Sequence, residues 1–218
     1  MDIIRPRLTD YHGIHKNQAD LDFAIQFFDE DIPLYVDPFL LWKSPSQQDN
    51  ALYTTITNSF NHLNYLIKKK QEDEALSILI DISECHEVGL GVSKTRKGTK
   101  ISEKQAQDIL SLFKDIPEYS QFGFTHFEII QLYISGISKD RISDITCNYL
   151  KSFLIDYTIE QCEINKIPTE GVILDSIYNY KTNKLDTNQK VYLPVNTLTK
   201  EPLILTPKRW LRFTPWIN

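Results

Sequence analysis

The stretch SKDRISDITCNYLKSFLIDYTIEQCEINKIP, residues 138–168, carries the longest helical pattern in the chain. Its apolar residues recur mostly at spacings of three and four, the period of one face of an α-helix. Proline cannot continue a helix, so Pro168 should end this one. We therefore predict a long helix here, whose apolar stripe consists of Ile142, Ile145, Tyr149, Phe153, Tyr157 and Ile164.

Helical patterns also occur upstream, and each begins with a recognisable start signal. Ser44 can cap a helix that has Pro45 in its first turn. The pairs Ser102 with Gln105 and Thr125 with Glu128 have the spacing of a capping box. Acidic residues open the remaining two patterns. The predicted helices cover residues 20–28, 44–70, 72–83, 102–116 and 125–136.

The pattern changes after the long helix. Residues 168–218 contain five of the ten prolines, and the runs KVYLPV (190–195) and PLILTP (202–207) are typical of short strands near prolines. A run at residues 33–42 also suggests an extended, buried segment. We predict a mainly α protein in which residues 1–168 form a multi-helix domain. Residues 169–218 form a small extended, β-containing segment docked on it.

Composition limits the class of protein. The 218 residues carry a net charge of -5, which argues against a wholly electrostatic nucleic-acid binder but allows a local basic patch. The three cysteines form no CxxC pair, so a reduced, cytoplasmic protein is expected. No apolar run reaches the roughly 18 residues that a membrane span needs, and we expect no membrane association.

The stretch EVGLGVSKTRKGTKIS, residues 87–102, combines glycines with basic side chains just before a predicted helix. Backbone amides of such a loop can bind phosphate, because no Cβ blocks the approach and a helix start is partly positive. The spacing matches neither the P-loop nor the dinucleotide-binding pattern. A solvated connector is the alternative interpretation. The ligand-contact residues of this hypothesis are Gly89, Gly91, Lys94, Arg96, Lys97 and Lys100.

A polar stripe marks the first half of the long helical stretch. Asp140, Asp144 and Asn148 recur every four residues and therefore share one helical face, with Arg141 beside them. They could bind a ligand, cap the helix and form ion pairs, or hold the glycine loop in place. We predict that the loop and this stripe form one contact surface.

Clustered carboxylates give an enzyme alternative. A Mg²⁺-dependent nuclease would use Asp37, Glu84, Glu87 and Asp144 as oxygen ligands. The Glu-x-Lys spacing of many such sites is absent from IDISECHE (80–87). The five histidines show no metal-ligand spacing and are interpreted as isolated residues. Outside this alternative, no metal or cofactor is expected.

The tail PKRWLRFTPW, residues 207–216, interleaves basic and aromatic side chains. Aromatic rings stack on bases while cations contact phosphates, so single-stranded nucleic acid is one possible partner. The aromatic rings could instead anchor the tail on the core. In a third interpretation, Trp210 and Trp216 meet a protein partner.

Three blocks together resemble a family. They are LYVDPFLLWKS (34–44), EVGLGVSK (87–94), and DRISDITCN (140–148) followed by LIDYT (154–158). Residues 20–168 are similar to the N-terminal region of long, mostly uncharacterised bacterial proteins associated with restriction and phage-defence islands. Those relatives have a richer glycine block, like Gly-Ser-Gly-Ile-Gly, whereas this chain has KGTKIS at 97–102. The resemblance implies a context and no specific activity.

The leading functional hypothesis follows from that context. The protein is expected to be a component of a bacterial antiviral defence or restriction-type system. It would bind nucleic acid or nucleotide, or scaffold a partner that performs the chemistry. The alternatives are the Mg²⁺-dependent nuclease and a protein-interaction module without catalysis. The sequence leaves open whether the protein is an enzyme.

Overall fold

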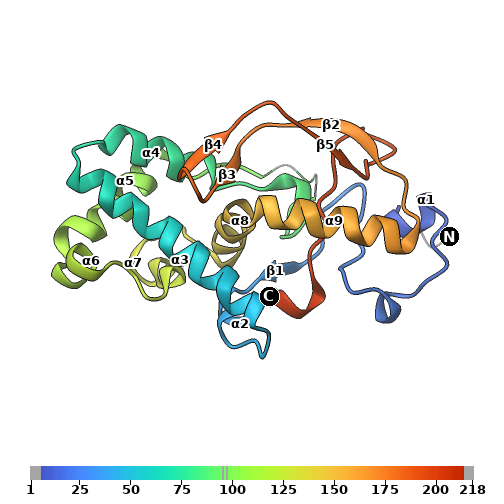
Figure 1. Ribbon diagram of the computed structural model, residues 1–218, viewed down its shortest axis with the longest axis horizontal. Coiled ribbons are helices and arrows are strands. Elements are labelled where there is room, and N and C mark those ends of the chain that lie inside the picture. Colours follow the sequence, from blue (N-terminus) through green and yellow to red (C-terminus); the bar gives the residue numbers. More distant parts are fainter. Residues whose placement is uncertain (1–5, 95, 97, 214–218) are drawn as a thin grey trace.

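The computed structural model describes residues 6–94, 96 and 98–213. The protein is mainly helical, with a short strand-containing region toward the C-terminus. Figure 1 shows an elongated molecule in which α3 to α7 group at one end. The helix α9 and the N-terminal segment occupy the other end, and α8 lies between them.

The helical end is built around a cluster of aromatic rings. Phe60 is fully buried, and its ring centroid lies 5.2–5.9 Å from those of Phe113, Phe124 and Phe127. The predicted capping box of Ser102 and Gln105 is confirmed at the start of α5. The helices of this end are α3 (Gln47–Lys68), α4 (Glu72–Asp81), α5 (Glu103–Asp115), α6 (Pro117–Phe122) and α7 (Ile130–Tyr133).

Two local predictions in this end were wrong. The helix α3 begins after Ser46, whose side chain accepts a hydrogen bond from the Asp49 amide, and not after Ser44. Residues 125–136 do not form one helix but a 3₁₀ turn, Phe127–Ile129, followed by the four-residue α7. The predicted capping box with Thr125 does not form. The Glu128 carboxylate instead accepts a hydrogen bond from the Tyr53 hydroxyl, 3.2 Å away.

The predicted long helix is divided in two. The helix α8 covers Lys139–Tyr149 and α9 covers Lys151–Asn165, with Leu150 between them at φ -95° and ψ 7°. In Figure 1, α8 is seen nearly end-on while α9 lies across the view. The stripe is therefore not continuous, and Ile164 is 60% exposed. The break allows Lys151, the first residue of α9, to reach a buried carboxylate described below.

The predicted helix at residues 20–28 is absent. After a 3₁₀ turn at Gln18–Asp20 the chain runs irregularly, although Leu21, Phe23, Ala24 and Phe28 are buried. The amide of Ala24 donates to the Thr206 carbonyl at 3.2 Å, and the Gln26 side chain donates to the Ile204 carbonyl at 2.6 Å. These long-range bonds replace the local bonds that a helix would have made. The preceding helix α1 covers Leu8–Tyr11.

Strands form where distant segments meet. The strand β1 (Leu34–Val36) pairs antiparallel with β6 (Leu211–Phe213). The chain after β1 turns into α2 (Pro38–Trp42), which Asp37 caps, so the extended prediction for residues 33–42 was right only for its first half.

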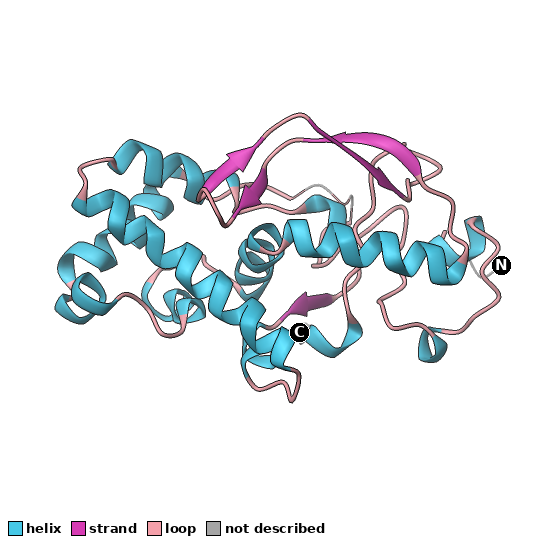
Figure 2. Cartoon of the chain, viewed as in Figure 1, coloured by secondary structure: helices cyan, strands magenta, loops and turns pink. Residues whose placement is uncertain are grey.

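A long hairpin covers the middle of the molecule. Its outer pair is β2 (Glu170–Leu174) with β5 (Gln189–Leu193), and its inner pair is β3 (Ile177–Asn179) with β4 (Lys184–Asp186). Figure 2 shows it running above α8 and α9. The strand predicted at 190–195 is thus largely confirmed. Residues 202–207 form no named strand, yet Leu203, Ile204 and Leu205 are completely buried.

The C-terminal segment belongs to the packed interior. Tyr178, Ile204 and Trp210 are part of the main hydrophobic core, and Leu203 and Leu205 pack with N-terminal residues in a second cluster beside α9. Among the helices of the described ranges, none is long and apolar enough to cross a membrane.

Candidate functional site

The glycine-basic loop folds inward at Arg96. This side chain is 5% exposed, and its guanidinium donates to the carbonyls of Phe27 (2.8 Å), His86 (3.3 Å) and Glu87 (3.5 Å). Burial lowers the pKa of Arg96, and the nearby carboxylate of Asp31 opposes that shift. The hypothesis that Arg96 contacts a ligand at the surface is therefore not supported by its position.

The loop glycines make room for charged side chains. A Cβ on Gly89 would lie less than 3 Å from the Arg96 guanidinium, and one on Gly98 would lie less than 3 Å from the Glu84 carboxylate. A Cβ on Gly91 would lie 3.5 Å from Asp31. Gly89 and Gly98 therefore allow side chains of this protein to approach the backbone, whereas the contact at Gly91 would be an ordinary one. This arrangement differs from the phosphate cradle considered from the sequence.

The loop and α8 line a common pocket of about 260 Å³. Ser138 caps α8 and places Asp140, Arg141 and Asp144 on the pocket wall. Of the residues predicted from the sequence, the pocket brings together Gly91, Glu84, Asp140, Arg141 and Asp144. Asp31 and Gly98, which were not in the predicted set, also line it.

Arg141 lies among these acids. Its Nη1 donates to the carbonyl of Ser83, and it lies 3.3 Å from Glu84 Oε2 and 3.4 Å from Asp144 Oδ2. Asn148 faces inward rather than toward the pocket, is 1% exposed, and donates to the carbonyls of Ile82 and Glu84 at 2.8 Å each. The polar stripe thus anchors the segment that leads into the loop.

Two carboxyl groups of the pocket have perturbed acidity. Burial raises the pKa of Asp31 to about 6, with Arg96 opposing and Glu84 adding to the shift. Burial, and then the charge of Glu84, also raises the pKa of Asp144 well above its ordinary value, although Arg141 opposes this. Both shifts arise mainly from removal of the carboxyl groups from water, and the neighbouring carboxylates add to them.

A buried ion pair lies next to the pocket. Lys151 and Glu87 are 3% and 4% exposed, and Nζ lies 3.1 Å from Oε1. Cys85 Sγ lies 3.6 Å from the other Glu87 oxygen. Burial raises the pKa of the Cys85 and Cys147 thiols, so both remain protonated and neither is an activated nucleophile. The sequence analysis missed Lys151, because a lysine in a helical pattern is normally solvated.

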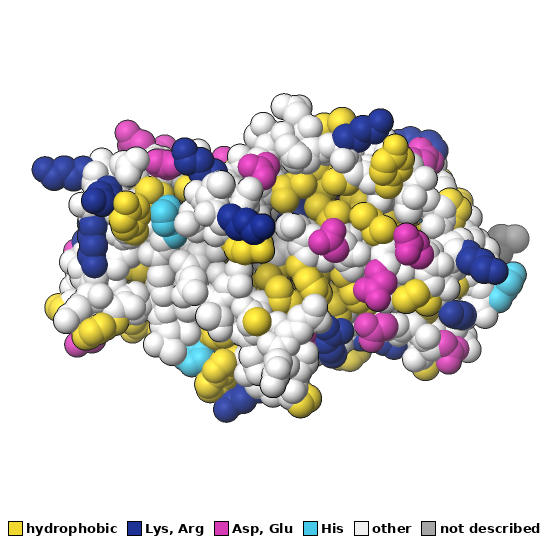
Figure 3. All heavy atoms as spheres, viewed as in Figure 1, with side chains coloured by type: hydrophobic (Ala, Val, Ile, Leu, Met, Phe, Trp, Pro, Cys, Tyr) yellow, Lys and Arg dark blue, Asp and Glu magenta, His cyan; other side chains and the backbone are white. Residues whose placement is uncertain are grey.

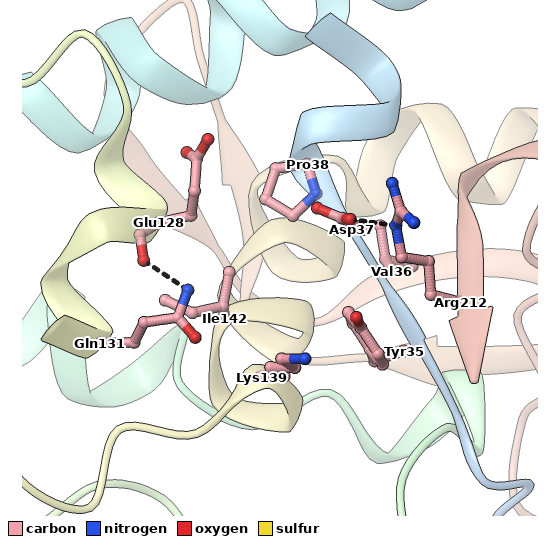
Figure 4. Close-up of a pocket in the computed structure, with 9 residues that line it drawn as sticks. All are labelled: Tyr35, Val36, Asp37, Pro38, Glu128, Gln131, Lys139, Ile142 and Arg212. Carbon is pink, nitrogen blue, oxygen red and sulfur yellow. Dashed lines mark hydrogen bonds and ion pairs between the residues drawn. The ribbon is translucent and has the colours of Figure 1, made fainter. Parts of the chain in front are cut away.

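The four acids of the nuclease alternative are not brought to one place. Glu87 is held by Lys151, and only Glu84 and Asp144 share the acidic pocket. Asp37 caps α2 and pairs with Arg212 in a different pocket, of about 300 Å³, between β1, β6 and the start of α8 (Figure 4). In the part of the chain that the structure describes, no group of three His, Cys, Asp or Glu side chains could hold a metal ion.

The two described lysines of the loop have different surroundings. Lys100 pairs with Asp81 at 2.6 Å, and Lys94 is exposed. Lys97 falls outside the described residues. In the tail, Trp210 is 1% exposed and packs against Phe153, so its ring anchors the chain and is not free for a partner. Trp216 also falls outside the described residues.

The structure also contains a Tyr-His-Glu cluster that the sequence patterns did not predict. Tyr53 Oη lies 2.6 Å from His126 Nδ1 and 3.2 Å from each oxygen of Glu128. Burial, and then Glu128, raises the pKa of Tyr53, which therefore remains a neutral donor. Glu128 also lines the pocket of Figure 4. Tyr53 and His126 are 73 positions apart, so no local pattern could reveal the cluster.

The fold and the site together define a mainly helical domain in which a glycine loop and a helix enclose an acidic pocket. The chain belongs to the family described as Domain of unknown function (DUF8370), whose model matches residues 13–218. This match includes the C-terminal segment that lies beyond the sequence resemblance. No curated protein and no solved structure matches the chain significantly.

We expect Asp31→Asn to stabilise the protein at neutral pH. Between its ordinary pKa of 3.8 and about 6, the unfolded chain has released the Asp31 proton while the folded chain keeps it. Ionisation of Asp31 therefore lowers the free energy of unfolding as pH rises, and the full loss is present above pH 6. The expected gain is about 1–3 kcal/mol at pH 7.5 and near zero at pH 3.5.

The measurement for Asp31→Asn is urea unfolding of wild type and variant at several pH values. Asp73→Asn, on the exposed start of α4, is the control and should show no such pH dependence. A gain that does not change between pH 3.5 and 7.5 would contradict the burial argument.

Proposed function

We propose that this protein is a binding module without catalysis, and that its acidic pocket holds a cationic group with hydrogen-bond donors, a guanidinium or an ammonium. The observation that supports this most directly is the charge of the pocket. Among the residues that the structure describes, Asp31, Glu84, Asp140 and Asp144 line it together with one cation, Arg141. A bound cation would stabilise the ionised forms of Asp31 and Asp144, which burial disfavours.

The size of the pocket favours a small group. Pockets for drug-sized ligands are about 300–1,000 Å³, and this one is about 260 Å³. A single lysine or arginine side chain of another protein is of suitable size. In the context implied by the sequence resemblance, a bacterial defence or restriction-type assembly, the module would then scaffold the partner that performs the chemistry.

The same charges make an anionic ligand less favourable. Arg96 is committed to three backbone carbonyls and Arg141 to Ser83 and two acids, so neither guanidinium is free to bind phosphate. A nucleotide would also place its phosphates beside the carboxylates. Nucleic-acid binding and Mg²⁺-dependent cleavage are therefore alternative outcomes of the test.

The test is calorimetric titration with N-acetyl-arginine amide and with its uncharged analogue N-acetyl-citrulline amide. We expect the citrulline compound to bind at least tenfold more weakly, a difference of about 1.4 kcal/mol. Binding should weaken from pH 7.5 to pH 5, because Asp31, with a pKa of about 6, becomes protonated. Agmatine carries the same guanidinium but no peptide groups. Tighter binding of agmatine would indicate a small free amine as the natural ligand, and tighter binding of N-acetyl-arginine amide would indicate a protein side chain.

Variants connect the binding to the pocket. Asp140→Asn should reduce the affinity at least tenfold, and the control Asp73→Asn should not change it. Equal binding of the arginine and citrulline compounds would refute the proposal. Retention of ATP or single-stranded DNA that Lys94→Ala abolishes would establish the nucleic-acid function instead. Cleavage that requires Mg²⁺ would establish the nuclease.

A further inference from the structure

A groove separates the first half of α3 from α9. It consists of two adjoining hollows of about 310 and 450 Å³, which share Gln48, Phe153 and Asp156. Figure 3 shows hydrophobic surface in the centre of this face with acidic side chains along one side. None of the residues that line the acidic pocket contributes to the groove.

The floor of the 310 Å³ hollow is mostly apolar, whereas the 450 Å³ hollow is lined mainly by polar and charged side chains. Ala51 and Leu52 contribute from α3, while Leu150 and Phe153 contribute from the α8–α9 side. Tyr149 also lines this hollow, is 2% exposed, and packs edge-on against Tyr178. Its hydroxyl has no hydrogen-bond partner among the described residues.

The rim of the groove is acidic. Asp156 and Glu160 are exposed and four residues apart on α9, so they lie on one face and repel each other. Within the described ranges, neither forms an ion pair with a lysine, arginine or histidine. Arg209 lines the same hollow, but it is held by the fully buried Asp49 at 3.0 Å through two nitrogens, and by Asp22 at 3.5 Å.

We infer that this groove is a docking site for a basic amphipathic helix of a partner protein. The apolar face of the partner helix would cover the floor of the groove. Lysine or arginine residues one turn apart on that helix would pair with Asp156 and Glu160. Charge complementarity identifies this occupant, since an apolar floor with an acidic rim disfavours nucleic acid and anionic lipid. The inference is independent of the proposed function, because the two sites share no residues.

The experiment uses the full chain and a fluorescently labelled 18-residue helical peptide of leucine and lysine, with binding followed by anisotropy. A matched peptide with glutamate in place of lysine is the control. We expect the basic peptide to bind, and the acidic peptide to bind at least tenfold more weakly. Absence of binding by the basic peptide would refute the inference.

Variants localise the binding. The double substitution Asp156→Lys with Glu160→Lys should weaken binding at least tenfold, and Ala51→Gln should weaken it by filling the floor. Asp73→Lys with Glu118→Lys makes the same change in net charge at exposed positions on α4 and α6, and should retain most of the binding. Equal losses in the two double variants would indicate a non-specific charge effect and overturn the inference.

Sedimentation of the wild-type chain tests whether a second copy occupies the groove. A monomer at micromolar concentration is the expected result. A dimer that Asp156→Lys with Glu160→Lys disrupts would assign the groove to self-association and exclude a separate partner protein.

Discussion

Replacing Lys151 with methionine is expected to destabilise the protein by about 3–5 kcal/mol, because it leaves the Glu87 carboxylate buried without its partner. Glu87 is 4% exposed, and Lys151 is the residue whose ammonium lies 3.1 Å from it. Methionine has a similar length and a good helix propensity, so the change removes mainly the charge. Urea unfolding at pH 7.5 measures the loss.

The pH dependence of this variant follows from Glu87. Burial alone would raise the pKa of Glu87, but Lys151, His86 and hydrogen bonds together outweigh it, with Lys151 contributing most, and the net shift is downward. The stability that the pair contributes is therefore present above the ordinary pKa of 4.5 and is lost as pH falls through the lowered value. We expect the difference between wild type and Lys151→Met to shrink in acid.

The double variant Lys151→Met with Glu87→Leu is the control. If the cost arises from an unpaired buried charge, removing both charges should restore most of the stability, since an apolar pair of similar volume is often tolerated. A double variant as unstable as the single one would show that the positions matter through packing. The cause assigned here would then be wrong.

Gly89→Ala is the second change for which we expect a large effect, a destabilisation of about 3–5 kcal/mol. Gly89 has φ 58°, where a side chain costs about 1–2 kcal/mol. The new Cβ would also overlap the Arg96 guanidinium, which would have to leave its three carbonyl partners. Charged hydrogen bonds of this kind contribute about 1.5–3 kcal/mol each.

Gly13 supplies a matched control for backbone strain. It has φ 63°, nearly the same as Gly89, but a Cβ there would meet nothing within 4 Å. Gly13→Ala should therefore cost only about 1–2 kcal/mol. Thermal or urea unfolding of both variants separates the strain of the left-handed backbone from the displacement of Arg96. Equal losses would mean that Arg96 contributes little to holding the loop.

Part of the site could be predicted from the sequence. The spacing of Asp140 and Asp144 on one helix turn placed both carboxylates on one face, and the structure puts that face beside Gly91 and Gly98. The inward direction of Arg96 and Asn148 could not be predicted. Both side chains bond to backbone carbonyls that are 9–69 positions away, which no local pattern encodes.

The most consequential acid of the pocket was also missing from the predicted set. Asp31 follows a short acidic run and has no periodicity that relates it to the loop. Only the packing of residues 31–32 against residues 89–93 places it there, through the amide of Asp31 donating to the Ser93 carbonyl at 2.9 Å. Its raised pKa follows from that burial.

The sequence by itself determined the helices α3, α4 and α5 through their apolar period, and for α5 the start signal as well. It also determined that the chain becomes extended after Pro168. Local propensity decides these elements because each one forms most of its hydrogen bonds within itself.

Only the tertiary structure decided the irregular course of residues 21–28, the break at Leu150 and the inward turn of the loop. In each case a long-range interaction outweighs the local preference. Residues 24–26 bond to residues 204–206, Lys151 must reach Glu87, and Arg96 must reach Phe27. Buried polar groups need hydrogen-bond partners, and these partners can be far away in the sequence. Local sequence patterns therefore do not reveal which residues will pair.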